Sequence, residues 1–367
     1  MEIGNEFDIA PVLRAWALEP GLCEIQAYGS GHINSTFKVS APEEIFLLQR
    51  INHHIFKDVE KLMANFSLTT RFILNNAPTD EPYPTIRLIS TSSGAGFFRS
   101  ADGNYWRAMH LLPGSYTIDT ARNTGEAYES GSVLGRFYRM LQNFKSEELF
   151  MTLPAFHSLG GRYRQFESAL AQADFERISM AHEWIEISNK LHATLQPLGD
   201  KIDSGYFPLR VVHNDPKINN ILFDSRGKGL CMIDLDTVMP GCLLHDFGDA
   251  IRTTASLSAE DEADISLVNV SIPLFEAYTR GFTGQFGNYL SDAEKKHLHK
   301  TPALMAFIIG LRFLTDFLNN DVYYRVHHPG HNLQRAAAQL TLASKMGESE
   351  DAFARIIQST IQAGQGS

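Results

Sequence analysis

The residues best suited to chemistry lie in one stretch, 211–252, of the 367-residue chain. Asp215 is followed by Lys217 two places on and by Asn220 five places on, and Asp234 comes later in the stretch. Phosphoryl transfer needs such groups: a carboxylate receives the proton of an attacking hydroxyl, while an amide oxygen and a second carboxylate hold Mg²⁺ against the phosphates. We therefore predict a phosphotransferase site. Asp215 would contact the acceptor hydroxyl as the catalytic residue, and Lys217 would neutralise charge on the transferring group.

The second carboxylate is expected at the end of a β-hairpin. Two short apolar runs, 221–223 and 230–233, are separated by a polar turn that contains two glycines, which is a hairpin signal. The second run delivers Asp234 at its end, and Asp236 follows two places later. The sequence thus predicts Asn220 and Asp234 as magnesium ligands, with Asp236 as a further candidate ligand.

The spacing H-x-D-x-x-x-x-N, followed after a hairpin by I-D, is similar to the catalytic loop and metal-binding aspartate of protein kinases. Here these residues are His213, Asp215, Asn220 and Asp234. The chain resembles the aminoglycoside phosphotransferase and choline kinase superfamily, in which Asp246 of H-D-F-G-D matches the structural aspartate that ties down the catalytic loop. Within that superfamily, H-N-D-P-K-I-N-N and M-I-D-L-D-T-V-M-P-G closely resemble bacterial N-acetylhexosamine 1-kinases.

This resemblance implies both a fold and a reaction. The fold would be the α+β, two-lobed protein-kinase-like fold, with a small β-rich N-lobe and a large, mostly helical C-lobe. ATP would be the phosphoryl donor and Mg²⁺ the cofactor. The acceptor would be the anomeric hydroxyl of an N-acetylhexosamine (GlcNAc or GalNAc), and the product the sugar 1-phosphate.

Composition excludes several other classes of protein. A formal net charge of −10 argues against a nucleic-acid-binding face and against binding to an anionic membrane. Three cysteines suit a reducing compartment rather than a disulfide framework, and the N-terminus shows no secretory signal. The longest apolar run, 303–311, is too short to span a bilayer. We expect a cytoplasmic enzyme of undetermined oligomeric state.

A glycine pair near the N-terminus is the candidate nucleotide loop. Gly29, Ser30 and Gly31 lie between two strand-like runs, where their backbone N–H groups would cover phosphates. Asn34 occupies the place of the third glycine of the protein-kinase pattern. The stretch G-H-I-N-x-T-F resembles the hexosamine kinases, which implies that His32 faces the sugar.

The candidate phosphate-binding cation departs from the kinase pattern. In kinases the next strand carries a lysine that binds the α- and β-phosphates. The strand expected at 45–50 has Gln49 and Arg50 there instead. Choline kinases place an arginine at this strand, so Arg50 is the candidate; an ordinary arginine of an edge strand is the alternative.

The connection between the lobes is expected at H-L-L-P-G. Backbone groups of Met109, His110 and Leu111 would hydrogen-bond the adenine edge, since apolar slots with a few backbone donors bind purines. Later apolar patterns predict helices. The expected divisions are an N-lobe at 1–109, a hinge at 110–114 and a C-lobe at 115–367, with helices at 123–144, 162–196, 260–282, 290–318, 332–346 and up to 362.

The candidate acceptor pocket lies in the stretch 301–324. Arg312 interrupts an apolar helix, and a buried guanidinium is costly unless it is paired. Asp316, one turn later, is a possible ion-pair partner. The match of R-F-L-T-D-F-L-x-x-D-V-Y-Y to N-acetylhexosamine 1-kinases implies instead that Arg312, Asp321 and Tyr323 bind the sugar.

Two alternatives stay open. Another small hydroxyl substrate, such as choline, homoserine or an aminoglycoside, would keep the catalytic loop and change only the helical lobe. The expected C-lobe lacks an aromatic-rich cage for a quaternary amine. A nucleotide-binding regulator with weak or no turnover is the second alternative. The unusual Gln49 and Arg50 favour it, whereas the intact Asp215, Asn220 and Asp234 oppose it.

Overall fold

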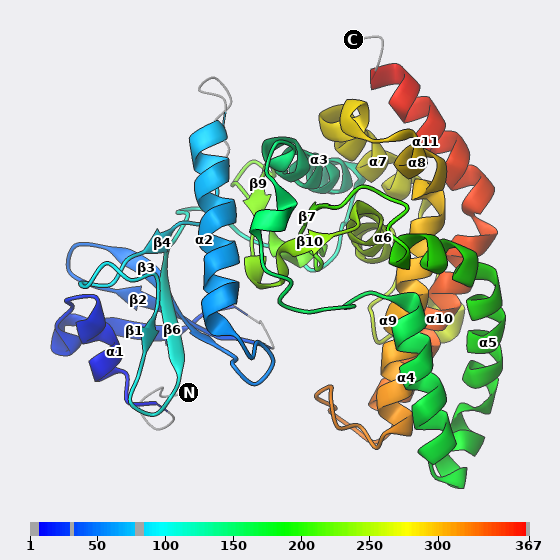
Figure 1. The fold of residues 1–367 in the computed structure, drawn as a ribbon, viewed down its shortest axis with the longest axis horizontal. Helices are drawn as coiled ribbons and strands as arrows, with labels where there is room; N and C mark the ends of the chain where they lie inside the picture. The colour runs from blue at the N-terminus through cyan, green and yellow to red at the C-terminus, as the bar shows by residue number, and fades with distance from the viewer. Residues whose placement is uncertain (1–6, 30–32, 78–83, 365–367) are drawn as a thin grey trace.

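The computed structural model describes residues 7–29, 33–77 and 84–364. A small lobe built on an antiparallel sheet lies beside a larger lobe made mostly of helices (Figure 1). The predicted two-lobed α+β fold is confirmed.

The small lobe is organised by one twisted antiparallel sheet. Its strand order is β1-β2-β3-β6-β4, and β5 also pairs with β6. Helix α1 packs on one face through an apolar cluster that includes Trp106, and α2 packs on the other face around Ile51. Figure 1 shows α2 between the sheet and the helical lobe. The elements are α1 (Ala10–Ala15), β1 (Glu24–Ala27), β2 (Ser35–Ser40), β3 (Ile45–Ile51), α2 (Val59–Asn76), β4 (Leu88–Ile89), β5 (Phe98–Arg99) and β6 (Tyr105–His110).

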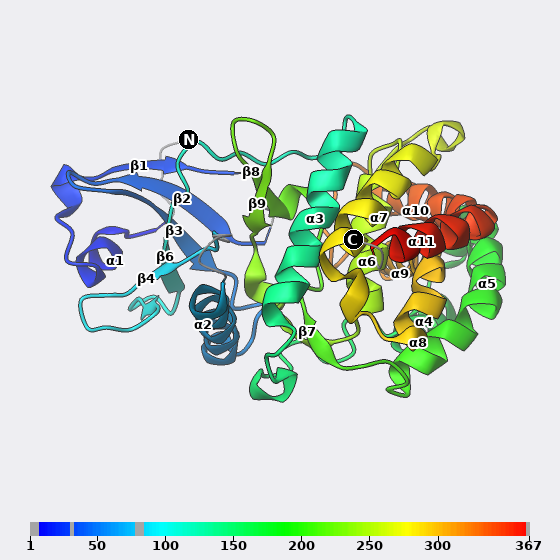
Figure 2. The ribbon, with the colours of Figure 1, turned by 90° about the horizontal axis from the view of Figure 1, so that it is seen from above.

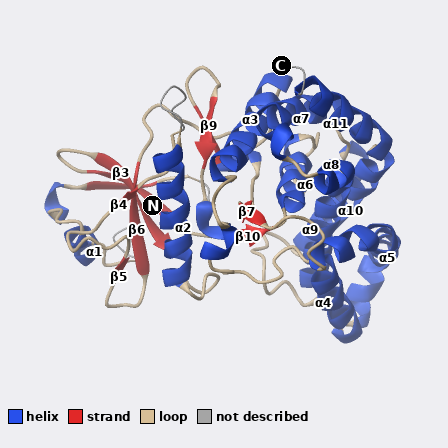
Figure 3. Ribbon diagram, turned by 45° about the horizontal axis from the view of Figure 1, so that its top comes forward, coloured by secondary structure: helices blue, strands red, loops and turns tan. Residues whose placement is uncertain are grey.

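The large lobe carries two short hairpin-like sheets on the side that faces the small lobe. Strand β7 pairs with β10 and β8 with β9, both antiparallel (Figure 3). The predicted hairpin around 224–229 is therefore confirmed as β8–β9, and Figure 2 shows it between the sheet of the small lobe and helix α3. The strands are β7 (Arg210–Val212), β8 (Ile221–Phe223), β9 (Gly229–Met232) and β10 (Met239–Gly241).

Helices form the rest of the large lobe, and α9 is its core. Helix α9 is buried almost throughout and packs against α4, α5, α6 and α10. In the described part of the chain, Asp292–Leu318 is long and apolar enough to cross a membrane, but 89% of its apolar window is buried inside this lobe. The helices are α3 (Thr124–Leu141), α4 (Leu159–Gln172), α5 (Phe175–Asp203), α6 (Leu243–Thr254), α7 (Ile272–Phe286), α8 (Asp292–His297), α9 (Thr301–Leu318), α10 (His331–Glu348) and α11 (Glu350–Gly364).

Several predicted helices begin or break elsewhere than expected. The predicted helix 162–196 is two helices, α4 and α5, because the backbone is extended at residues 173 and 174. The predicted helix 260–282 begins only after Ser271, whose side chain accepts a backbone N–H of the first turn of α7. The segment 290–318 contains α8 and α9 separated by a 3₁₀ turn. Apolar periodicity identified these regions, but local capping set the ends.

Candidate active site

The catalytic loop follows β7, and a buried carboxylate accepts hydrogen bonds from its backbone. Asp246 of α6 is fully buried and accepts the backbone N–H groups of His213 (2.6 Å) and Asn214 (2.8 Å). The hydroxyl of Tyr138 donates a third hydrogen bond, at 2.8 Å. Asn214 itself is in the left-handed region, with φ of 65°. The predicted role of Asp246 in tying down this loop is confirmed.

His213 supports the loop rather than acting as a base. Its Nε2–H donates to the Ile233 carbonyl at 2.8 Å, and its Nδ1 accepts the backbone N–H of Asp215 at 3.3 Å. The ring is buried, and this burial lowers its pKa, so His213 is neutral near pH 7. Both ring nitrogens are therefore committed to shaping the turn that presents Asp215.

Asp215 is oriented by two neighbours. The Asn220 side-chain amide donates to the Asp215 backbone carbonyl (2.9 Å) and to Oδ2 (3.0 Å). Lys217 Nζ lies 3.2 Å from Oδ1, and both side chains are about one-third exposed, at 33% and 28%. Burial raises the pKa of Asp215, but the charge and hydrogen bond of Lys217, together with His213 and Arg252, lower it overall. The negative charge of Asp215 in turn raises the pKa of Lys217. The pair is thus a carboxylate and an ammonium group at neutral pH.

Asp234 directly follows β9 in a left-handed conformation, with φ and ψ both 57°. Its side chain reaches solvent yet is crowded by protein, and this desolvation, with the nearby Asp236 and Asp215 carboxylates, raises its pKa to about 7. Within the described residues, the Asp234 carboxylate and the Asn220 side-chain oxygen accept no hydrogen bond. Crowded carboxylates beside a free amide oxygen suit a hard cation.

These donors fit Mg²⁺ better than a metal held by protein alone. The described residues contain no group of three or more His, Cys, Asp or Glu side chains placed to hold an ion. Magnesium is usually held by one or two carboxylates together with substrate phosphates and water. Asn220 and Asp234 would therefore hold Mg²⁺ only with a nucleotide present, and the ion would neutralise and orient its phosphates.

The structure corrects the prediction of Asp236 as a metal ligand. Its Oδ1 accepts from Arg107 Nη1 at 2.5 Å, and its Oδ2 accepts from the Asn34 side chain at 2.6 Å. The Arg107 and Asp236 side chains are each only 1% exposed. Because both oxygens already have short hydrogen bonds and lie away from solvent, Asp236 is an ion-pair partner.

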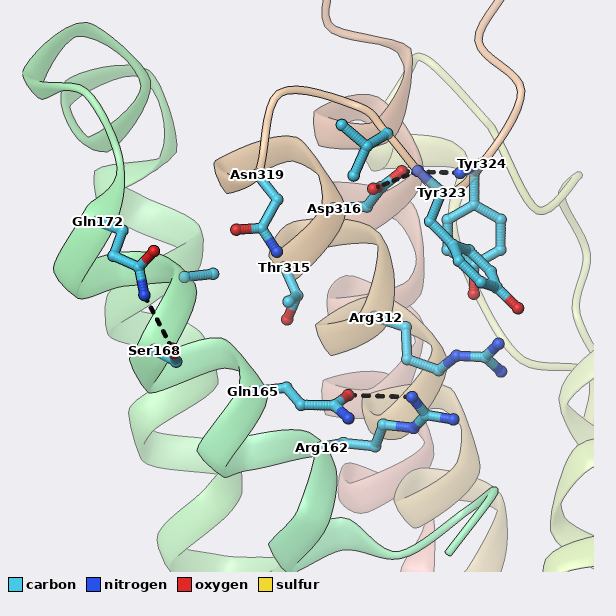
Figure 4. A pocket seen from close by; sticks show the side chains of 12 residues that line it. Arg162, Gln165, Ser168, Gln172, Arg312, Thr315, Asp316, Asn319, Tyr323 and Tyr324 are labelled. Atoms are coloured by element: carbon cyan, nitrogen blue, oxygen red, sulfur yellow. Dashed lines mark hydrogen bonds between the residues drawn. The ribbon is translucent and has the colours of Figure 1, made fainter. Parts of the chain in front are cut away.

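A cavity of ≈ 480 Å³ with both polar and apolar lining lies between α4, α9 and the segment that follows α9 (Figure 4). Figure 4 shows Arg162 and Arg312 reaching in the same direction at one end, while Gln172 and Asn319 lie at the other. Arg312 and Tyr323, two of the predicted sugar-binding residues, both line this cavity. The lining residues are Arg162, Gln165, Ser168, Ala169, Gln172, Arg312, Thr315, Asp316, Asn319, Val322, Tyr323 and Tyr324.

Arg312 is not the ion-pair partner of Asp316, so the structural alternative for this arginine is wrong. The Asp316 carboxylate accepts the backbone N–H groups of Tyr323 (2.8 Å) and Tyr324 (2.9 Å) and the Asn332 side chain (2.9 Å). The Arg312 guanidinium lies over the rings of Phe156 (5.2 Å) and Tyr324 (5.7 Å). In the described part of the chain it makes no ion pair, so its N–H groups remain free for a ligand.

The predicted sugar contact of Asp321 is also corrected. Its Oδ2 lies 2.9 Å from Arg177 Nη1, and its Oδ1 accepts from the Asn332 side chain at 2.9 Å. Asp321 is absent from the residues that line the cavity. Both of its oxygens anchor the segment after α9 to α5 and α10, so Asp321 supports Tyr323 without reaching the cavity.

Arg162 is a cavity residue that the sequence did not reveal. It donates to the Phe156 carbonyl (2.7 Å) and to Gln165 (3.0 Å). Burial, together with the nearby Arg312 charge, lowers its pKa to about 10, so it stays protonated. His157, which follows Phe156 in the chain, donates to the Asn214 carbonyl at 2.9 Å. Residues 156 and 157 therefore lie between this arginine pair and the catalytic loop.

Comparison with known proteins identifies the family. Residues 24–270 match the profile of the phosphotransferase enzyme family, which is more than half of the chain. The chain belongs to this family.

Solved phosphotransferase structures share the whole fold at low sequence identity. An aminoglycoside phosphotransferase from Alicyclobacillus acidocaldarius subsp. acidocaldarius DSM 446 is 13% identical, with a TM-score of 0.58 over 92% of each chain. A spectinomycin phosphotransferase solved with ADP and spectinomycin is 12% identical, with a TM-score of 0.57 over 96% of this chain and 98% of that one. Plasmodium vivax ethanolamine kinase is 13% identical, with a TM-score of 0.51 over 87% of this chain and 82% of that one.

The glycine-rich loop of this phosphotransferase lies between β1 and β2, which pair antiparallel. The Tyr28 N–H donates to the Thr36 carbonyl (2.9 Å) and closes the hairpin. Gly29 has a φ of +78° and open space where a side chain would project, a backbone conformation that favours glycine. The predicted Ser30, Gly31 and His32 lie outside the described residues.

Arg50 faces the wrong side of the sheet to bind phosphates, so that prediction is wrong. Side chains alternate along a strand, and Arg50 shares the α1 face with Phe46 and Leu48 of that cluster. Its guanidinium lies 4.5 Å from the Phe7 ring. Gln49 occupies the opposite face, where Arg107 of β6 is its cross-strand partner. Arg50 follows the apolar residues Phe46 and Leu48 at intervals of two, which places all three on one face of β3. This spacing could have excluded Arg50 from the sequence alone.

Of the three predicted purine contacts, only Leu111 lies outside the sheet. Met109 is paired with Leu47 of β3 and Leu88 of β4, and the His110 N–H donates to the Arg87 carbonyl at 2.9 Å. The Met109 backbone and the His110 N–H are therefore used by the sheet, whereas the His110 carbonyl accepts no hydrogen bond among the described residues. The predicted purine contact of Met109 is wrong, and those of His110, through its carbonyl, and Leu111 stay predictions. The linker then bonds to the large lobe at Tyr116, which forms a bridge with Phe223.

Proposed function

We propose that this phosphotransferase transfers the γ-phosphoryl group of ATP to the anomeric hydroxyl of an N-acetylhexosamine, with Mg²⁺ bound at Asn220 and Asp234. The observation that carries the proposal is the lining of the cavity: two guanidiniums, amides and tyrosines line it, and Asp316, the only acid among the described lining residues, has its oxygens engaged. Sugar hydroxyls and an acetamido group need such directional donors and acceptors. Both guanidiniums contact Phe156, and its neighbour His157 bonds to the catalytic loop.

Asp215 receives or orients the proton of the attacking hydroxyl in this proposal. Its lowered pKa keeps it ionised, and an anomeric hydroxyl is more acidic than an ordinary alcohol, so a carboxylate of ordinary strength suffices. Lys217 stays cationic and offsets charge on the transferring group. Asn220 fixes the carboxylate through its amide. Positioning and electrostatic stabilisation supply most of the rate enhancement in this reaction class.

The cavity argues against amine-bearing acceptors. Choline, ethanolamine and aminoglycosides carry positive charge, which binding sites meet with free carboxylates or aromatic cages. Arg162 and Arg312 would instead repel a cation. The spectinomycin and ethanolamine enzymes named above share the fold only, at 12% and 13% identity. A homoserine acceptor or a regulator without turnover would keep the same loop, and an activity screen separates them.

An ADP-release assay across an acceptor panel tests the proposal. The panel contains GlcNAc, GalNAc, the unacetylated hexosamines, choline, ethanolamine, homoserine and an aminoglycoside, with a no-acceptor blank. We expect Mg²⁺-dependent ADP release with the N-acetylhexosamines well above all other acceptors. Release that is highest with choline or an aminoglycoside would refute the acceptor assignment, and no release with any acceptor would favour the regulator.

Arg312→Ala should raise the KM for the sugar by about 10- to 100-fold, the range for a lost charged hydrogen bond of about 1.5–3 kcal/mol. The KM for ATP should change by less than about twofold, because the guanidinium touches only the acceptor side. Steady-state kinetics on both substrates, with the Tm as a check of folding, measures this.

Arg164→Ala is the matched control, because Arg164 is an exposed arginine on α4, the helix that also carries Arg162. Both KM values should stay at the wild-type level in that variant. An equal rise of both KM values in Arg312→Ala, together with a strongly lowered Tm, would show that Arg312 has a structural role only.

A further inference from the structure

Two departures from the kinase-like sequence pattern meet at one buried ion pair. Asn34 stands where the third glycine is usual, and Gln49 stands where the strand lysine is usual. Both side chains bond to the Arg107–Asp236 pair, Asn34 through Asp236 and Gln49 through Arg107. The pair joins β6 of the small lobe to the turn after Asp234 in the large lobe.

All three nitrogens of the buried Arg107 guanidinium donate to protein groups. Its Nε and Nη2 donate to Gln49 Oε1 at 2.9 and 2.5 Å, and its Nη1 donates to Asp236 at 2.5 Å. The Phe66 ring of α2 lies 4.9 Å from the guanidinium. Gln49 in turn donates to Thr36 Oγ1 at 2.8 Å, which extends the network to β2.

Asn34 extends the network to the end of the glycine-rich loop. Its Nδ2 donates to Asp236 Oδ2 at 2.6 Å, and its Oδ1 accepts the backbone N–H of Asn52 at 2.9 Å. The amide orientation is therefore set from both ends. A glycine at position 34 could make neither bond, so the departure from the pattern has a specific structural consequence.

We propose that Arg107 and Asp236 form a positioning pair that couples the two lobes, with Asn34, just before β2, tethering the small lobe to the turn that presents Asp234. Asp236 lies two residues after Asp234 in the turn Leu235–Thr237, so fixing Asp236 fixes the turn that presents Asp234. A buried arginine of β6 is thus bonded to the residue that stands at the place of the usual strand lysine. The inference concerns nucleotide binding and holds for any acceptor.

A double-mutant cycle tests the coupling. Asn34→Ala, Asp236→Asn and the double variant are compared by calorimetry with ATP in Mg²⁺ and in chelator, without acceptor. Each single change should reduce the Mg²⁺-dependent gain in ATP affinity by about tenfold. The loss in the double variant should be far smaller than the product of the two single losses, since contacting residues couple by about 0.5–3 kcal/mol. ATP affinity in chelator should change by less than about threefold in Asp236→Asn, because the metal-binding turn acts through Mg²⁺.

Arg99→Met is the control, since Arg99 is an exposed arginine of β5 that lies over the Tyr105 ring, and the change should leave both affinities unchanged. Because Asp236→Asn leaves a buried arginine underpaired and could prevent folding, Asn34→Gly is a second test that keeps the Arg107–Asp236 pair. Losses that multiply in the double variant, or a folded Asn34→Gly protein with wild-type Mg²⁺-dependent affinity, would overturn the proposal. Failure of sugar phosphorylation would leave this binding test unaffected.

Discussion

Replacing Asp215 with asparagine is expected to lower kcat by at least about a hundredfold, the lower end of the usual contribution of general acid–base catalysis. Asparagine keeps the shape of the side chain and can still accept from Asn220, so the catalytic loop should fold normally. It cannot accept a proton, and it removes the negative charge beside Lys217. The affinity for ATP should change little, because Asp215 lies on the acceptor side of the reaction.

Asp224→Asn is the matched control for this experiment. Asp224 is an aspartate of the β8–β9 turn whose Oδ1 accepts the backbone N–H groups of Arg226 and Lys228 at 2.8 and 2.9 Å. An asparagine oxygen can accept the same bonds, so kcat should stay within about twofold of the wild type. Near-normal turnover in a folded Asp215→Asn protein would remove Asp215 from the proposed chemistry.

Asp234→Asn should abolish most of the Mg²⁺-dependent gain in nucleotide affinity, by at least about a hundredfold, since even outer partners of metal ligands typically contribute ten- to a hundredfold. Asparagine is chosen because it tolerates the left-handed backbone that Asp234 adopts, with φ of 57°. Calorimetry with ATP, in the presence and absence of Mg²⁺, measures the effect without any acceptor. Asn220→Ala should act in the same direction through the lost amide oxygen.

Asn269→Ala is the control for these two variants, because Asn269 lies in the exposed loop before α7 and its replacement changes no charge. Its Mg²⁺-dependent affinity should match the wild type. If Asp234→Asn and Asn220→Ala both keep the wild-type Mg²⁺ dependence, the metal would have to be held elsewhere.

The two-lobed fold could be predicted from the resemblance to the phosphotransferase superfamily, and the catalytic loop because its determinants are local. Asp215, Lys217 and Asn220 lie within six consecutive residues, and the structure brings their side chains together at 3.0–3.2 Å. The β8–β9 hairpin has a polar turn between two apolar runs, which also needs no distant contact. Their chemical roles remain predictions that the variants above test.

The ion-pair partners could not be predicted, because they are distant in sequence. Arg107 and Asp236 are 129 positions apart, and Arg177 and Asp321 are 144 apart. No periodicity links such pairs, so Asp236 and Asp321 resembled free ligands until the fold supplied their arginines. Arg312 is the opposite case, because the partner expected from the sequence, Asp316, is only four residues away. The Asp316 carboxylate instead accepts backbone N–H groups.

The central claim is most directly tested by locating the new phosphate on the product. The protein is incubated with ATP, Mg²⁺ and GlcNAc or GalNAc, and the product is examined by two-dimensional ³¹P–¹H NMR. The account predicts a phosphorus resonance that correlates with the anomeric proton of the sugar and is absent when Asp215→Asn replaces the wild type. A phosphorus correlation to the C6 methylene protons, or an unmodified sugar beside consumed ATP, would contradict it.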